Sequence, residues 1–299
     1  MNMPEVVQYR TLVYANSRRS RVESLLDEMP VGLALLNRDR SVQHWNRAAE
    51  ALSGRHRHTV VGSRWEDGLL VALRGCAMRR TFLRHREGHL LAVEVSAHRL
   101  PPALAGADAT LATLIAASPV MPVLEHARGN PELDLLDTMT GLGNRRLAAQ
   151  ELESYLIRHQ LQRWPFGLAL FDIDSMQALN ARHGFECGDR ILRASSLTLA
   201  ACLDASDVLC RWGGEQFLAL LHGSTAAVEA KAELCRAAIE QVSLQWLGTP
   251  VAFTISGGVE MAGTGDHPHD LIGHAAYRLR MSKRLGRNRI TGCPAGQAE

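Results

Sequence analysis

The stretch that most constrains the fold is residues 166–174, FGLALFDID. The run Phe166–Phe171 is apolar apart from one glycine, which is typical of a strand buried on both faces of a sheet. Asp172 and Asp174 follow at once, and charged side chains at the end of such a strand have to turn toward a cleft. Carboxylates suit a hard divalent cation, because Mg²⁺ prefers oxygen ligands. We therefore expect Asp172 to be a metal ligand and Asp174 to cap the next helix.

The second half of the chain alternates helical and strand patterns. Apolar periodicity predicts helices over 145–162, 190–203, 225–242 and 269–285, strands over 166–173 and 251–259, and a hairpin centred on 213–214. This order predicts an α+β domain in which helices lie on one face of a mostly antiparallel sheet.

The first half has a different pattern, with short strands in the range 30–46, a short helix after them, a hairpin around Glu87 and Gly88, and a last strand over 110–117. Between the halves, prolines at 119, 122 and 131 exclude an unbroken coiled coil. A chain of 299 residues is long enough for two domains. We expect an N-terminal helix over 1–21, a first domain over 22–118, a linker over 119–137 and a second domain over 138–299.

Charge and composition exclude several classes of protein. Residues 1–123 carry 16 arginines and 11 acids, and the rest carries 17 basic residues and 20 acids, but neither half has the clustered basic stripe of a nucleic-acid binder. The apolar run 109–123 is too short for a membrane span. The N-terminal residues lack the apolar core of an export signal, so we expect a cytoplasmic protein. The six cysteines form no CxxC pair, which argues against a zinc site.

Two further groups of residues are candidates for chemistry. Gly213 and Gly214 at a hairpin tip allow close approach of a phosphate, and Glu215 follows them directly. Lys283, one of only two lysines, stands four residues before Arg287, so the two cations would share a helix face and could hold a polyphosphate. Taken singly, a tight turn is the default explanation of the hairpin, and a solvated helix face is the preferred explanation of the two cations.

Four ordered motifs of the second half resemble the GGDEF family of diguanylate cyclases. They are DTMTGLGNRR at 137–146, FDIDSMQALNARHGFECGD at 171–189, RWGGEQF at 211–217 and SKRLGRN at 282–288. The first half resembles a PAS sensor domain through the run MPVGLALLNRDRSVQHWNRAAEALSG, the VVGSRW turn and the REGHLLAVEVSAHRL hairpin. The resemblance implies a PAS-like domain followed by a palm-like α+β domain.

The GGDEF resemblance implies that the chain condenses two GTP into cyclic di-GMP and pyrophosphate with Mg²⁺ or Mn²⁺. It makes Asp172 and Glu215 catalytic metal ligands, assisted by the Ile173 carbonyl. The substrate contacts that it implies are Asn180 and Asp189 for guanine, Gly213 and Gly214 at the tip, and Lys283 and Arg287 for the terminal phosphates. Each subunit would hold one GTP, so the active form would be a homodimer.

Several positions depart from the family pattern. Gln216 replaces the second acid of the GG[DE]EF motif, and Gln177 replaces a phosphate-binding lysine. The other departures are Ala181, Phe185, Ala276 and Arg280. The inhibitory R-x-x-D motif reads Asp204-Ala-Ser-Asp207.

These departures keep an alternative open: a weak or inactive GGDEF protein that binds GTP or a protein partner. A purine cyclase with another product is disfavoured by Asp189. For the PAS-like half we assign no cofactor, because it has no flavin-binding cysteine run and no histidine in the range 65–78.

Overall fold

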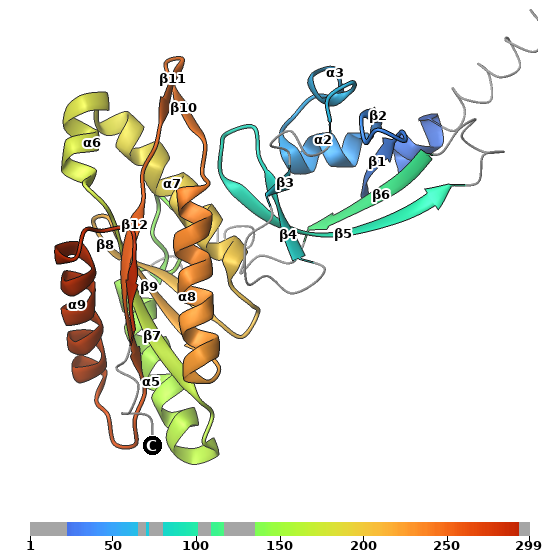
Figure 1. Cartoon of the computed structure of the whole chain (residues 1–299). Helices are drawn as coiled ribbons and strands as arrows, with labels where there is room; N and C mark the ends of the chain where they lie inside the picture. Colours follow the sequence, from blue (N-terminus) through green and yellow to red (C-terminus); the bar gives the residue numbers. More distant parts are fainter. Residues whose placement is uncertain (1–22, 65–69, 72–79, 101–108, 117–134, 293–299) are drawn as a thin grey trace, which may run out of the picture. The chain divides into compact units, whose positions relative to one another are not determined.

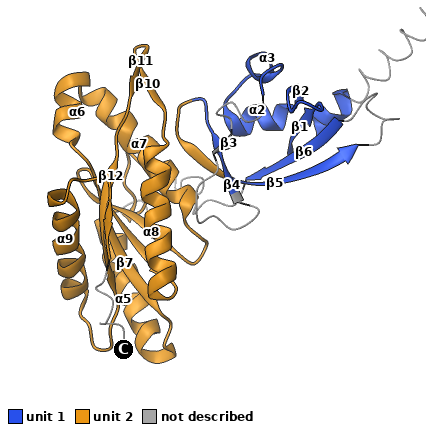
Figure 2. Ribbon diagram, viewed as in Figure 1, with its two compact units in different colours: residues 1–70, 79–86, 93–116 blue, residues 71–78, 87–92, 117–299 orange. Residues whose placement is uncertain are grey.

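The computed structural model describes residues 23–64, 70–71, 80–100, 109–116 and 135–292. The chain divides into two compact units (Figure 2), the first made of residues 1–70, 79–86 and 93–116 and the second of residues 71–78, 87–92 and 117–299. The expected helix over 1–21 and nearly all of the expected linker lie outside the described residues. Among the described helices, none is long and apolar enough to cross a bilayer.

The first unit is built around an antiparallel sheet. Its strand order is β2-β1-β6-β5-β4-β3, with β1 Gly32–Leu36, β2 Val42–Trp45, β3 Leu70–Val71, β4 Arg80–Arg84, β5 Leu90–Leu100 and β6 Ala109–Ala116. Two short helices, α2 Arg47–Ser53 and α3 Arg57–Val60, follow β2. Asn46 fixes the start of α2, because its side-chain oxygen accepts from the backbone N–H groups of Ala49 and Leu33. The predicted hairpin and last strand of this half are confirmed.

The second unit has a five-stranded sheet of order β13-β12-β7-β9-β8 (Figure 1). Its strands are β7 Phe166–Ile173, β8 Val208–Gly213, β9 Gln216–His222, β12 Ile255–Met261 and β13 Ile290–Thr291. All pairs are antiparallel except β12 with β13. A separate hairpin, β10 Leu244–Trp246 and β11 Thr249–Val251, precedes β12. The strand expected over 251–259 is therefore two strands, interrupted at residues 252–254.

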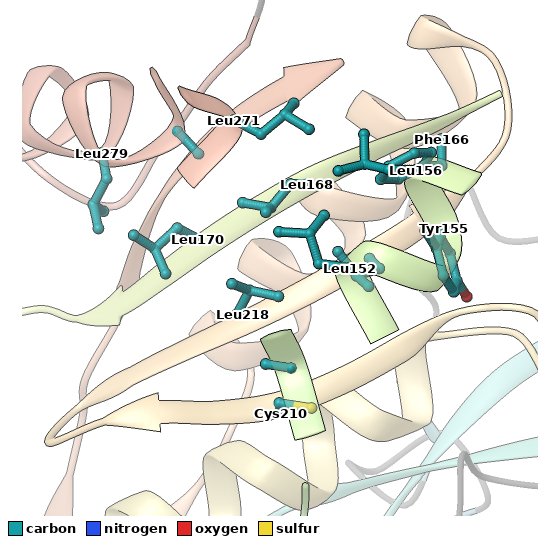
Figure 3. Packing of buried hydrophobic residues seen from close by; sticks show 13 residues of the cluster. Leu152, Tyr155, Leu156, Phe166, Leu168, Leu170, Cys210, Leu218, Leu271 and Leu279 are labelled. Atoms are coloured by element: carbon teal, nitrogen blue, oxygen red, sulfur yellow. The ribbon is translucent and has the colours of Figure 1, made fainter. Parts of the chain in front are cut away.

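Helices cover both faces of this sheet, which corrects the expectation of one. They are α5 Arg145–Gln162, α6 Met176–His183, α7 Phe185–Cys202, α8 Thr225–Glu240 and α9 Pro268–Arg284. Helices α5 and α9 pack on Leu168 and Leu170 of β7 (Figure 3). On the other face, Val228 of α8 packs against Gly167. Every residue of β7 is buried, and a strand of this kind needs a covering layer on each side.

Candidate functional site

Asp172 lies at the end of β7, where the register pairs it with Gln216 of β9. The residue is only 4% exposed. Gln216 Nε2 donates a hydrogen bond to Asp172 Oδ2 at 2.9 Å, and Lys283 Nζ lies 2.5 Å from Asp172 Oδ1. Gln216 and Lys283, which come from separate segments of the chain, thus both contact the carboxylate of Asp172. All three positions are singled out in the sequence analysis. Both oxygens of that carboxylate have a donor.

The hairpin tip lies next to this carboxylate. Gly213 and Gly214 have φ values of 148° and 54°, and a Cβ at either position would have nothing within 4 Å. Glu215 is half-buried, and its backbone carbonyl accepts from Ile173 N at 3.2 Å. In the part of the chain that the structure describes, its carboxylate makes no hydrogen bond or ion pair. The tip therefore offers open space and a carboxylate free to bind a ligand.

Asp174 does not cap α6, contrary to the expectation from the sequence. Its carboxylate accepts from the hydroxyls of Thr254 and Ser256, each at 2.7 Å, and from Asn288 N at 3.0 Å. The N-cap residue of α6 is Ser175, whose side chain makes no capping bond. Asp174 instead joins the end of β7 to β12 and to the segment after α9. Through its bond to Asn288 N, the buried Asp174 holds in place the segment that carries Arg287.

Asn180 and Asp189 come from neighbouring helices, α6 and α7. Asn180 Oδ1 is buried and has no hydrogen-bond partner within the described chain. A Cβ at Gly188 would lie 2.0 Å from that oxygen, so glycine is needed for the two helices to approach here. Asp189 is the next residue and is half-buried. A buried amide oxygen without a partner is costly unless a ligand satisfies it, and this one lies against Gly188, the residue before Asp189.

Lys283 and Arg287 do not share a helix face, because α9 ends at Arg284 and Arg287 lies beyond it with a φ of 63°. Lys283 contacts Asp172, whereas Arg287 is exposed and lines a cavity with Asp174 and Ser175. The two cations therefore reach the end of β7 from different directions. The expectation of a shared helix face, which was based on their spacing of four residues, is therefore wrong, and their binding of phosphates stays a prediction.

Two departures from the family pattern lie on the surface of the same region. Gln177 is exposed on α6, and Phe185, at the first position of α7, is 80% exposed. The sequence did not single out Arg211, whose Nε and Nη2 atoms donate to the Gly214 carbonyl at 3.1 and 2.8 Å. Its place two residues before Gly213 was the only available signal.

Comparisons with known proteins find family matches in both halves of the chain. Residues 134–289 match the family described as "Diguanylate cyclase, GGDEF domain", and residues 20–87 match a PAS domain. The response regulator PleD of Caulobacter vibrioides is 34% identical over 173 residues, which cover 54% of this chain and 36% of PleD. The chain thus spans little more than a third of that relative.

Two solved structures are also similar. The diguanylate cyclase SiaD of Pseudomonas aeruginosa, solved with its activator SiaC, has a TM-score of 0.53 and 28% identity, covering 54% of this chain and 63% of that one. The coiled coil and GGDEF domain of DgcB from Caulobacter crescentus, solved with cyclic di-GMP, has a TM-score of 0.52 and 25% identity, covering 54% and 87%. Since the family match spans more than half of its residues, this chain belongs to the GGDEF family of diguanylate cyclase domains.

Proposed function

We propose that this protein is a diguanylate cyclase, which condenses two GTP into cyclic di-GMP with release of pyrophosphate. The observation that carries the proposal is the convergence of Lys283 and the Gly213–Gln216 tip on the buried Asp172 carboxylate. A buried carboxylate with a lysine and an open glycine tip beside it is suited to phosphoryl transfer, in which positioning and charge neutralisation provide most of the catalysis.

Substrate recognition is divided between two places. Asn180 and Asp189 would read guanine, because an aspartate can accept from both the ring N–H and the neighbouring exocyclic amine of guanine, whereas adenine has no ring N–H beside its amine. Lys283 and Arg287 would hold the terminal phosphates through charge-assisted hydrogen bonds. The 3′-hydroxyl of one GTP would then attack the α-phosphate of the other. Since each subunit holds one GTP, we propose that two second units face each other in a homodimer.

A divalent cation, Mg²⁺ or Mn²⁺, fits the chemistry of the donors at the end of β7. Asp172, Glu215 and the Ile173 carbonyl are oxygen ligands of the kind that these ions prefer. The ion would neutralise charge that develops on the transferring phosphate. Lys283 first has to release Asp172 Oδ1, and the amide of Gln216 contributes no negative charge. We therefore propose weak metal binding that is assisted by the phosphates of the substrate.

A second candidate function follows from that same carboxylate. With Lys283 paired to Asp172 and Gln216 donating to it, the charge of this carboxylate is already balanced without a metal. Such a domain could bind GTP without turning it over and act through a protein partner. This alternative predicts GTP binding that does not depend on added Mg²⁺.

We propose that product inhibition through the R-x-x-D position is absent. Asp207, at the aspartate position of that motif, is 3% exposed, and Lys231 Nζ lies 2.9 and 2.8 Å from its two oxygens. The arginine position is Asp204, which also pairs with Lys231 at 3.1 Å. The buried Asp207 carboxylate is therefore paired with Lys231 and is not accessible to a ligand.

The test of the proposed function is incubation of the purified full chain with GTP and Mg²⁺ or Mn²⁺, with products separated by chromatography and identified by mass. Cyclic di-GMP and pyrophosphate are the expected products. Asp172→Asn should abolish them while GTP still binds at Asn180 and Asp189. GTP binding without product in the parent protein would favour the second candidate.

A further inference from the structure

The turn after α9 that carries Arg287 has an unusual backbone. Arg287 and Asn288 have φ values of 63° and 46°, so two consecutive residues that are not glycine adopt the left-handed conformation. Asparagine tolerates this conformation better than most residues, but arginine does not. A strained backbone of this kind persists only where the surrounding structure holds it. The position of Arg287 therefore depends on the contacts of its turn.

Two backbone hydrogen bonds hold the turn from the side of α9 and β7. Arg287 N donates to the Ser282 carbonyl at 3.0 Å, and Asn288 N donates to Asp174 Oδ2 at 3.0 Å. Both bonds use main-chain donors of the turn, and neither involves the side chain of Asn288. That side chain is bonded to another part of the fold, the helix α8.

Both polar atoms of the Asn288 side chain have partners on α8. Arg236 Nη1 donates to Asn288 Oδ1 at 2.8 Å, and Asn288 Nδ2 donates to Glu240 Oε1 at 2.8 Å. Arg236 Nη1 also donates to Glu240 Oε2 at 2.9 Å, so the three side chains form a closed ring. The amide has one favourable orientation in this ring, because its oxygen meets a donor and its nitrogen meets an acceptor.

Arg236 is itself well fixed on α8. Its Nε donates to Glu233 Oε1 at 2.8 Å, and the spacing of three and four residues places Glu233, Arg236 and Glu240 on one face of the helix. Hydrogen bonds from Arg236 and Asn288 hold the pKa of Glu240 below its ordinary value, so this carboxylate is charged at neutral pH. The bonds of the ring are therefore charge-assisted, which makes them stronger than bonds between neutral groups.

This ring joins elements from opposite faces of the sheet. Helices α8 and α9 both pack on β12, and Figure 1 shows this strand between them. After α9 the chain passes through the turn at Arg287 and Asn288 and enters β13 at Ile290. The ring thus fastens the turn to the helix on the other face. None of the roles proposed above uses Arg236 or Glu240.

We propose that Arg236 is a positioning residue for Arg287 and acts through the side chain of Asn288. The inference rests on the proposed function, in which Arg287 holds the terminal phosphates of GTP. Asn288 follows Arg287 directly, so a turn that loses its bond to Arg236 can relax from the left-handed conformation. The exposed guanidinium of Arg287 would then spend less time where it meets the phosphates. Affinity falls in proportion, because the ligand binds only the fraction of molecules that is competent.

The experiment is a double-mutant cycle on binding of the α,β-methylene analogue of GTP, which cannot release pyrophosphate, measured by calorimetry on the full chain. Arg287→Ala should weaken binding about tenfold, because it removes a charge-assisted contact. Arg236→Met should weaken it about fivefold, since fewer molecules hold Arg287 in place. The double variant should bind within about twofold of Arg287→Ala alone, because Arg236 then has nothing left to position. Arg236→Lys, which keeps one donor for Asn288 Oδ1, should restore part of the affinity.

The matched control is Arg278→Met. Arg278 lies on α9, and its side chain is 14% exposed, as is that of Arg236. It is also held by hydrogen bonds, from Nε to Glu260 Oε2 at 2.6 Å and from Nη1 to the Gly292 carbonyl at 2.7 Å. These bonds do not involve the turn after α9. The control removes the same charge from the same unit, and it should leave the affinity within about twofold of the parent.

Three outcomes would overturn the positioning role. One is unchanged affinity in Arg236→Met or in Arg287→Ala. Another is a double variant whose loss is the product of the two single losses, which would show that Arg236 acts independently of Arg287. The third is an equal loss in Arg278→Met, which would show that removing any such arginine weakens binding.

Failure of the proposed function is seen separately, in the assay for cyclic di-GMP. A parent that makes no cyclic di-GMP, but in which the losses from Arg236→Met and Arg287→Ala are not additive, would refute the cyclase. The positioning of Arg287 by Arg236 would remain in place for binding of the nucleotide.

Discussion

The guanidinium of Arg211 holds the carboxylate of Asp137, with Nη1 3.1 Å from each of its oxygens. The other nitrogens of the same group donate to the Gly214 carbonyl at the hairpin tip. Asp137 in turn accepts from the backbone N–H and the hydroxyl of Thr140, at 2.9 and 2.7 Å. One side chain thus ties the first turn of the GGDEF domain to the tip beside Asp172.

Arg211→Lys should keep a positive charge beside Asp137 but lose the two nitrogens that donate to the Gly214 carbonyl. A lysine has no planar pair of donors, so the tip should be less well positioned. We expect the rate of cyclic di-GMP formation to fall about tenfold or more, because small misplacements in a site of this kind are costly. GTP affinity should stay within twofold. Single-turnover assays and calorimetry measure the two quantities.

The matched control for this change is Arg145→Lys, since the Arg145 guanidinium stacks on Trp212, next to Arg211, without reaching the tip. It should keep activity within twofold of the parent. Equal losses in the two variants would show that any disturbance near Trp212 reduces activity, and the positioning role of Arg211 would be refuted.

Asp137 should also make the domain sensitive to acid. Burial works to raise the pKa of this carboxyl, but hydrogen bonds from Thr140 and the ion pair with Arg211 outweigh it, so the pKa lies below its ordinary value. Its stabilising contribution is therefore present above the unfolded pKa of about 4 and is lost as pH falls through the lower folded pKa. Urea unfolding between about pH 2 and 6 should show a smaller loss of stability on acidification in Asp137→Asn than in the parent. Identical pH profiles would contradict this.

Much of the second unit could be predicted from its sequence, because its elements have strong local signals. The helix over 145–162 and the strand over 166–173 were predicted with the observed bounds, since a capping asparagine or an uninterrupted apolar run marks them. Helix α6 was missed, because only Met176 of its eight residues is buried and half of them are polar, so they give no apolar period. The motifs pointed to the residues near Asp172, but they did not predict the hydrogen bonds and the ion pair that those residues make.

The contacts that could not be predicted from the sequence depend on how distant segments of the chain pair in the fold. Gln216 reaches Asp172 only because β7 and β9 pair in the observed register. Asp174 was read as a helix cap on local grounds, whereas its partners Thr254 and Ser256 are some 80 residues away. Long-range hydrogen bonds of this kind leave no local pattern.

The ion pair of Lys231 with Asp207 should be important for stability. The Asp207 side chain is fully buried, and Lys231→Met would leave its charge without a cation. Breaking a buried pair from one side should lower the free energy of unfolding by about 3 kcal/mol. Asp204→Ala is the control, because that partner is half-exposed and should be worth less than about 1 kcal/mol. Urea denaturation of both variants checks this, and equal small effects would contradict it.

Another prediction concerns Gln216. Its amide donates to Asp172 Oδ2, a bond that a glutamate at this position cannot make. In the absence of metal, Gln216→Glu should place two carboxylates together and lower the free energy of unfolding by about 1 kcal/mol. With Mg²⁺ the same change should tighten metal binding about tenfold, because the site gains a negative charge. Cyclase activity should rise, and added Mg²⁺ should raise the melting temperature more than in the parent.

Gln177→Lys separates a metal effect from a phosphate effect. Gln177 is exposed on α6, and a lysine there would add a cation for the phosphates but no metal ligand. We expect it to tighten GTP binding severalfold and to leave the dependence on Mg²⁺ unchanged, because one charge-assisted contact is gained. Titrating Mg²⁺ at fixed GTP, and GTP at fixed Mg²⁺, distinguishes the two variants. If Gln216→Glu shows the metal dependence of the parent, Gln216 does not face the metal, and reduced activity cannot be attributed to it.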